Sequence, residues 1–167
     1  MEEWRPIPDF PDYSISNLGR VRRDQTGRVL HLKVNQEGIA YVGLMRDYDQ
    51  HQRGLAKLVA NVFLDPKLEA FDTPINLDGN RMNCAVDNLM WRPRWFAVRY
   101  HQQFTSHRYN SPSELVRASV RAIDTGEVFD SPFDAAKRYG LLEYDVVQSM
   151  KYRTVTWPNY MRFEETT

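Results

Sequence analysis

Residues 75–91 read INLDGNRMNCAVDNLMW, and this stretch decides the fold expected for the chain. Its first half is polar and rich in turn formers, with Asp78-Gly79-Asn80 at the tip. Leu89-Met90-Trp91 is a short apolar run, and a helix is expected over 95–104. Just upstream, residues 55–63 carry apolar side chains at the spacing of a helix with one buried face. Short strands and short helices in separate small modules are therefore expected, which makes the chain α+β.

Moving outward on the N-terminal side, the pattern changes to strands. Residues 13–16 alternate in polarity, and a turn follows at Asn17-Leu18-Gly19. Residues 29–34 and 39–44 read as paired strands joined by a polar turn. The first 54 residues are therefore expected to form a β-rich module.

On the C-terminal side, residues 120–129 predict a β-hairpin around Asp124-Thr125-Gly126. Ser131-Pro132 then has the residue types that begin a helix, and Gly140 has the type that ends one. A second helix is expected over 143–151, and the pair has the layout of a helix-turn-helix. Spacing alone favours a plain pair of helices with no role in DNA binding.

Composition limits the function classes. Lys plus Arg number 22 and Asp plus Glu number 22, so the net charge is zero and a chain-wide basic field is excluded. Cys84 is the single cysteine, which excludes an internal disulfide and a cysteine-built zinc site. No apolar run is long enough for a membrane span, and the start lacks a signal peptide's features. We therefore expect a cytoplasmic protein with no membrane partner.

Three stretches, in this order, resemble the HNH homing endonuclease family. The N-terminal EEWRPIPDFPDYSISNLGRVRR is similar to the module that precedes the nuclease core of many such enzymes. LAKLVANVF followed by INLDGNRMNCAVDNLMW resembles the core, and TGEVFDSPFDAAKRYGLLEYDVVQSM resembles a helix-turn-helix module that follows it. The resemblance implies an N-terminal β module (1–54), a ββα-type HNH core (55–110) and a helix-turn-helix module (111–167). It reverses the preference for a plain helix pair.

The resemblance also implies which positions should carry the chemistry. Active cores of this family have an Asp-His or Asn-His pair before the Gly-Asn turn, and a later Asn on the following helix. The His activates water, and the other two residues bind a divalent metal that polarises the phosphate. Here the pair falls on Ile75 and Asn76, or with a one-residue shift on Asn76 and Leu77, and neither register contains a histidine. The late Asn falls on Ala97. An amide cannot accept a proton from water at neutral pH, so no catalytic residue and no metal ligand is expected.

The positions that shape the core match the family, unlike the catalytic ones. We expect structural roles for Asp78, Gly79, Asn80, Asn88 and Trp91. The chain's histidines lie outside the expected catalytic position, and they are His31, His51, His101 and His107. A rescue by one of them, or by Asp72 or Asp78, would need relocated geometry for both base and metal.

Two local clusters of basic residues predict contacts with DNA. Between residues 13 and 36, Asp24 is the single acid among five cations, and between Asp87 and Glu114 there is no acid at all. Arginines interleaved with aromatic side chains suit phosphate contacts and stacking. The residues expected to bind DNA in these clusters are Arg20, Arg22, Arg23, Arg28, Lys33, Arg92, Arg94, Arg99 and Arg108.

The second helix of the C-terminal pair offers a further set of DNA contacts. Gln148 and Ser149 could read base edges, and Lys151 and Arg153 could hold the phosphate backbone. Two acids, Glu143 and Asp145, stand near the start of this helix, where they suit the helix dipole but repel phosphates. The acids leave docking on another protein as a second use.

The sequence therefore predicts a protein that binds double-stranded DNA, has lost cutting, and acts by occupancy or regulation. A phage origin follows from the usual setting of this family, and the host-cell cytoplasm would be its location. No cofactor is expected. The first alternative is a divergent nickase, which alone would need Mg²⁺ or Mn²⁺. The second alternative is a phage protein that binds and modulates a host or phage protein.

Overall fold

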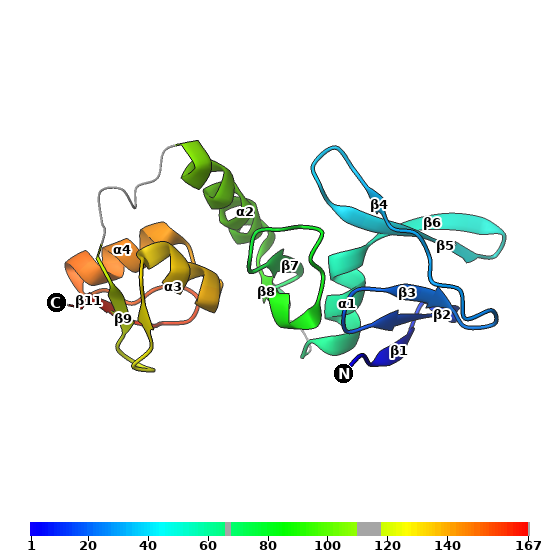
Figure 1. Ribbon diagram of the computed structural model, residues 1–167, viewed down its shortest axis with the longest axis horizontal. Coiled ribbons are helices and arrows are strands. Elements are labelled where there is room, and N and C mark those ends of the chain that lie inside the picture. The colour runs from blue at the N-terminus through cyan, green and yellow to red at the C-terminus, as the bar shows by residue number, and fades with distance from the viewer. Residues whose placement is uncertain (66–67, 110–117, 167) are drawn as a thin grey trace. The chain divides into compact units, whose positions relative to one another are not determined.

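The computed structural model describes residues 1–65, 68–109 and 118–166, and for residues 106–109 it describes the backbone alone (Figure 1). The chain divides into two compact units, Met1–Ala97 and Val98–Thr167. Each unit has its own buried hydrophobic cluster. The expected α+β class, with small antiparallel sheets and helices, is confirmed.

Two three-stranded antiparallel sheets begin the first unit. The first has the order β1-β2-β3, and the second has the order β4-β5-β6. Their strands are β1 (Trp4–Ile7), β2 (Phe10–Ser16), β3 (Val21–Arg23), β4 (Lys33–Val34), β5 (Ala40–Arg46) and β6 (Asp49–Gly54). Along β5 the buried residues alternate with more exposed ones, so one face of this sheet is turned into the core.

The hairpin of β5 and β6 turns through Asp47 and Tyr48, which both have positive φ, 54° and 67°. This pair of left-handed residues is typical of the two-residue turns that match strand twist. Asp tolerates that conformation better than Tyr does. The expected strand over 29–34 is shortened to Lys33–Val34, while β6 was not expected at all.

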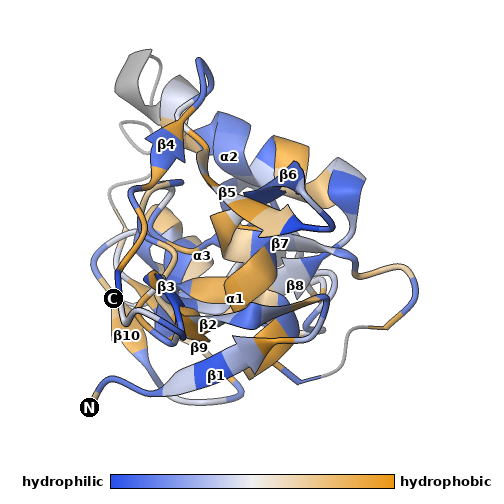
Figure 2. Cartoon of the chain, turned by 90° about the vertical axis from the view of Figure 1, so that its right-hand side faces the viewer, coloured by the Kyte–Doolittle hydropathy of each residue, from blue (hydrophilic) through white to orange (hydrophobic). Residues whose placement is uncertain are grey.

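Helix α1 (Leu55–Phe63) follows β6 directly and matches the predicted range. Leu55, Leu58, Val59 and Ala60 are buried on it, and Figure 2 shows its hydrophobic colouring. One buried cluster extends from Ile7 in β1 to Leu89 in β8 (Leu89–Arg92). The expected N-terminal module and the HNH-like core therefore share a hydrophobic core, so residue 54 does not separate two independently packed parts.

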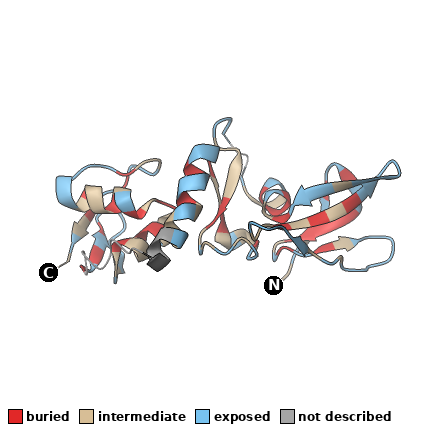
Figure 3. Ribbon diagram, turned by 90° about the horizontal axis from the view of Figure 1, so that it is seen from above, coloured by how far each residue is buried: buried red, intermediate tan, exposed pale blue. Residues whose placement is uncertain are grey.

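The region between α1 and α2 has the strand-strand-helix arrangement that the resemblance implied. Strand β7 (Thr73–Asn76) pairs antiparallel with β8, and a short 3₁₀ turn, η1 (Val86–Asn88), leads into β8. Helix α2 (Arg94–Tyr109) comes next and is longer than the predicted helix. Buried and exposed residues alternate along it (Figure 3). The boundary between the two units falls within α2, after Ala97.

The second unit combines a small sheet with two helices. The sheet has the order β10-β9-β11, and its strands are β9 (Val120–Ala122), β10 (Val128–Phe129) and β11 (Phe163–Glu165). Helices α3 (Pro132–Tyr139) and α4 (Glu143–Tyr152) lie between β10 and β11 in the chain. Ala136, Leu141 and Val146 are fully buried between these elements, whereas Val147 is only half-buried.

Both ends of α3 form as the residue types predicted. The Ser131 hydroxyl accepts a hydrogen bond from the backbone N–H of Asp134 at 3.1 Å, as an N-cap does. Gly140 ends the helix in the left-handed region, with φ 61° and ψ 45°. The connector to α4 is therefore short, and Leu141 within it is buried.

Candidate nucleic-acid interface

The ββα region places the three expected catalytic positions inside the protein. Ile75, Asn76 and Ala97 are 0%, 3% and 3% exposed. Ile75 lies opposite Met90, and Asn76 opposite Leu89, in the β7-β8 pairing. The Asn76 side-chain amide donates to the carbonyl oxygen of Asn83 at 2.9 Å, which ties the strand to the following loop. Asn76 therefore has a structural partner in the place where the family carries its base.

These side chains do not fit a divalent metal. The side chains of Ile75 and Ala97 have no ligand atom, so a single amide oxygen, that of Asn76, is the one possible side-chain ligand at these three positions. Among the residues that the structure describes, no three His, Cys, Asp or Glu side chains gather into a metal-binding group. Burial raises the pKa of the Cys84 thiol to about 11, so the thiol is protonated at neutral pH when no metal is bound.

Asp78 organises the loop between β7 and β8. Its carboxylate accepts from the Asn80 backbone at 2.9 Å, from Asn88 Nδ2 at 2.9 Å and from Asn83 Nδ2 at 2.7 Å. Gly79 has φ +76°, a conformation that glycine adopts without strain. This is the arrangement of a turn-forming residue, because both carboxylate oxygens are already engaged by the loop.

The remaining structural positions lie around this turn. Asn88 also accepts from the backbone N–H of Asp78 at 3.1 Å, and Asn80 accepts from the backbone N–H of Met82 at 3.0 Å. The indole of Trp91 donates to the carbonyl oxygen of Asp65 at 3.2 Å. These residues connect β7, β8 and the end of α1.

The histidines do not take over the catalytic position in the described part of the chain. His31 is exposed before β4, His51 lies in β6 against Phe10, and His101 lies in α2 beside Tyr100. The side chain of His107 lies outside the described residues. Asp72 accepts a hydrogen bond from the Thr73 hydroxyl at 2.9 Å. Among the described residues, none of these side chains belongs to a group of three or more His, Cys, Asp or Glu residues that could bind a metal ion.

The N-terminal basic cluster is on the surface, and part of it is held by neighbouring side chains. Arg20 forms an ion pair with Glu2, and this hydrogen bond lowers the pKa of the Glu2 carboxyl. Arg22 lies 4.5 Å over the Trp4 ring and 3.4 Å from Asp24. The other expected cations of this cluster are exposed, and they are Arg23, Arg28 and Lys33.

The second basic cluster needs one correction. Arg92 is 4% exposed, and its guanidinium donates to the Trp91 carbonyl oxygen at 2.9 Å and packs over Phe96. Strand β8 directs the Arg92 side chain into the protein. The guanidinium is therefore not available for phosphate contact. Arg94 and Arg99 are exposed on α2. The side chain of Arg108 lies outside the described residues.

On helix α4, the burial of Ser149 conflicts with the prediction that it reads base edges. Ser149 is 0% exposed, and its hydroxyl donates to the Thr154 carbonyl oxygen at 2.6 Å and accepts from the Phe163 backbone at 3.0 Å. It therefore joins α4 to β11 and cannot read a base. Lys151 and Arg153 are exposed, and Gln148 is partly exposed.

Tyr144 was not among the expected DNA contacts, and it is 68% exposed on the same side of α4 as Gln148 and Lys151. Glu143 and Asp145, the two acids expected to repel phosphates, do not belong to this exposed set of side chains. Glu143 is buried, and burial raises the pKa of Asp145, which a nearby Arg99 partly offsets. The exposed stripe of α4 is therefore polar and cationic. Helical periodicity from the buried Val146 would have identified it.

One exposed sheet face was also missed. The cross-strand pairs of β4, β5 and β6 put Lys33, Tyr41, Met45, Gln50 and Gln52 on the face opposite the buried residues. Glutamine amides can bond adenine edges, so this face has side chains suited to base contact. It was missed because β6 itself was missed.

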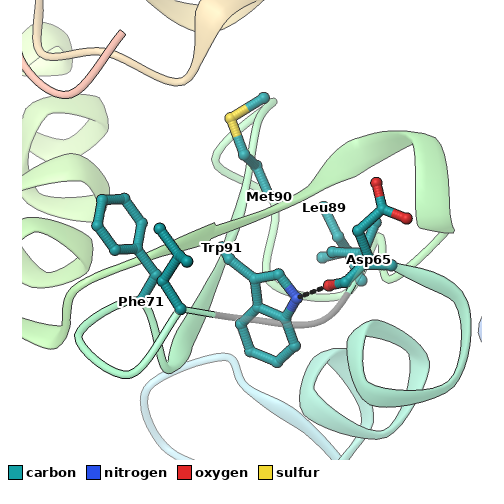
Figure 4. Close-up of a pocket in the computed structure, with 7 residues that line it drawn as sticks. Asp65, Phe71, Leu89, Met90 and Trp91 are labelled. Carbon is teal, nitrogen blue, oxygen red and sulfur yellow. Dashed lines mark hydrogen bonds between the residues drawn. The ribbon is translucent and has the colours of Figure 1, made fainter.

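A shallow pocket near the end of α1 has a different character (Figure 4). Its volume is about 360 Å³, and its lining is mainly apolar, formed by Leu64, Asp65, Leu68, Phe71, Leu89, Met90 and Trp91. Such a surface offers little to a phosphate or a metal ion.

Comparisons with known proteins agree with this geometry. The NUMOD4 motif matches residues 2–45. The uncharacterized HNH endonuclease L245 of Acanthamoeba polyphaga mimivirus is 23% identical over 139 residues, covering 83% of this chain and 40% of that protein. The H-N-H endonuclease F-TflII of Escherichia phage T5 is 30% identical over 91 residues, covering 54% and 47%. The chain is a relative of these HNH endonucleases.

A comparison with a solved structure shows that the similarity includes the fold. The HNH homing endonuclease I-HmuI, whose structure is described as DNA binding and cleavage, matches with a TM-score of 0.55 and 22% identity over 98% of both chains. The chain spans less than half of the length of L245 and F-TflII. No helix in the described part of the chain could cross a membrane.

Proposed function

We propose that this HNH relative binds duplex DNA without cutting it and acts by occupying or regulating a site. The observation that carries the proposal is the burial of Ile75, Asn76 and Ala97 at the expected catalytic positions, together with the lack of a metal-binding group among the residues that the structure describes. Losing a general base alone costs about 10²- to 10⁴-fold in rate. No divalent metal is therefore required for the proposed activity.

The case for DNA comes from the surface. Exposed cations persist on β3, on α2 and after α4, where Arg23, Arg94 and Arg153 are examples. The stripe of Tyr144, Gln148 and Lys151 on α4 supports the role of α3 and α4 as a helix-turn-helix. If Gln148 reads a base, Gln148→Ala should weaken binding to the cognate site and leave binding to random DNA unchanged.

A phage or viral origin is part of the proposal, with the host-cell cytoplasm as the place of action. Its support is that the two relatives come from a mimivirus and from phage T5. A protein that retains DNA contacts on a nuclease scaffold would compete with other proteins for its site. Blocking a site and regulating transcription are both consistent with binding alone.

The test selects DNA first and examines its strands second. The purified protein is mixed with randomised duplexes at moderate salt, and the retained duplexes are sequenced. The enriched duplex is then incubated with Mg²⁺ or Mn²⁺ and run on a denaturing gel. We expect an enriched motif and intact strands.

Other outcomes point to the two alternatives. Nicks in the enriched duplex would mean that the catalytic groups have moved, and they would support the divergent nickase. Absence of enrichment would remove site-specific DNA binding and favour a protein partner, which a pull-down would then seek. The salt dependence is a separate check, because five or six neutralised phosphates predict a slope of about −5 in log K against log salt.

A further inference from the structure

A cationic cluster lies around the ring of Phe10, outside both basic clusters considered so far. The guanidinium carbons of Arg46 and Arg53 each lie 5.3 Å from the centroid of this ring. The His51 ring lies 5.7 Å from it, inclined by 59°. Phe10 is 1% exposed, so these side chains cover it and form the outer surface.

The β5-β6 pairing brings the three residues to one face of the sheet. Arg53 lies opposite Val42, His51 opposite Leu44, and Arg46 is two residues beyond Leu44 on β5. Alternate residues of a strand point to the same side, so the face that buries Val42 and Leu44 continues outward into this Phe10 cluster (Arg46, His51 and Arg53). The cluster is thus built by strand register.

Each of the two guanidinium ions donates a hydrogen bond to a backbone carbonyl oxygen. Arg46 Nη1 donates to the carbonyl oxygen of Asp9 at 3.4 Å, and Arg53 Nη1 donates to the carbonyl oxygen of Gln52 at 3.0 Å. A guanidinium has five N–H donors, so donors remain on each for an anion. The aromatic face favours both cations, which offsets part of their mutual repulsion.

Three acids stand near the cluster: Asp9, whose carbonyl oxygen accepts from Arg46, and Asp47 and Asp49 at the hairpin tip. The Asp47 carboxylate lies 3.7 Å from Arg46 Nε and is highly exposed, so it binds that guanidinium weakly. Asp49 lies opposite Arg46 in the β5-β6 register. Arg53 and His51 are at the end away from the tip, and an anion would be most favourable there.

We infer that the Phe10 cluster is an additional phosphate-contact site, which binds a backbone phosphodiester of duplex DNA. This inference rests on the proposed DNA-binding function and adds a contact surface to it. A phosphodiester accepts hydrogen bonds from a guanidinium in a forked geometry, and its negative charge is attracted by both arginines. The contact positions the protein and carries no sequence information.

The test compares two double variants of the full chain on a fluorescein-labelled duplex of mixed sequence. R46Q with R53Q removes two charges from the Phe10 cluster. The matched control, R121Q with R162Q, removes two charges from exposed arginines that face Glu164 and Asp124 in the second unit. We expect the cluster variant to bind with a salt slope shallower by about 0.9 per lost contact, and the control to keep the wild-type slope.

Lysine variants and chemical protection guard against a folding artefact. R46K with R53K keeps both charges and should keep the slope. In the wild type, phenylglyoxal modification followed by mass spectrometry should show that DNA protects Arg46 and Arg53 but not Arg121. This second readout decides the question even where the glutamine variant does not fold.

The outcomes separate the inference from the proposed function. If the wild type binds DNA while the cluster variant keeps its slope and DNA gives no protection, the inference is overturned and the proposed function stands. If both double variants lose the same slope, a general charge effect replaces the site. If the wild type binds no duplex, both the proposed function and this inference fall.

Discussion

At the scale of single residues, the stability of an Asp78 variant tests whether this residue forms the β7-β8 turn. Asp78→Ala removes an acceptor of three hydrogen bonds in the β7-β8 loop. Because the loop is exposed, we expect a loss of about 1–2 kcal/mol in the free energy of unfolding, measured by urea denaturation. Asp12→Ala, on an exposed part of β2, is the control and should change stability by less than about 0.5 kcal/mol. Equal stability in both variants would contradict the turn-forming role.

The predicted site residues differ in how well their exposure followed from the sequence. The basic residues of loops and strand ends, such as Arg23 and Arg28, are exposed as charge alone suggests. Arg92 and Ser149 are buried, because their strand and helix turn them inward and neighbouring carbonyl groups satisfy them. A charge or hydroxyl count does not contain this information. The direction of a side chain depends on tertiary packing.

At the scale of secondary-structure elements, the N-cap of α3 gives a direct test of local sequence signals. Ser131→Ala removes the side-chain acceptor for the Asp134 backbone N–H and should cost about 1 kcal/mol in the free energy of unfolding. Ser131→Thr keeps both the acceptor and the hydroxyl that donates to the Asp134 carboxylate at 2.6 Å, so it should retain most of the wild-type stability. Thermal denaturation followed by circular dichroism measures both. A stable Ser131→Ala variant would mean that tertiary packing alone fixes the start of α3.

Helix α4 should respond to pH through Asp145. Burial raises the folded-state pKa of the Asp145 carboxyl above its ordinary value, so folding favours the protonated form. This contribution to stability is greatest at low pH and is lost as the pH rises from the unfolded pKa through the folded one. Asp145→Asn should therefore flatten the pH dependence in that acidic range and not in the alkaline range. The exposed Asp130→Asn is the control, and a matching change there would reject the explanation.

The elements differ in how much of their formation is local. Helix α1 was predicted to the residue because its apolar spacing agrees with its burial, and α3 because its caps are local. Strand β6, with the sequence Asp-Gln-His-Gln-Arg-Gly, has no apolar alternation to reveal it. It forms through pairing with β5, across a turn that lacks glycine. Strand β11 likewise depends on a distant partner, β9.

At the scale of the whole molecule, the two separate hydrophobic clusters predict separable stabilities. Leu44 is fully buried in the first cluster and Leu141 in the second. A buried Leu→Ala change costs about 2–5 kcal/mol, through lost apolar contact and the cavity that remains. Each substitution should therefore weaken its own unit first.

Hydrogen–deuterium exchange on the full chain can resolve this prediction. Leu44→Ala should speed exchange of amides in β2 and β5 while those of β9 and α3 keep their rates. Leu141→Ala should do the reverse, so each variant is the matched control for the other. Because α2 contributes to both units, its amides should report on either change. Uniform acceleration across the chain in both variants would mean that the two units unfold as one cooperative structure.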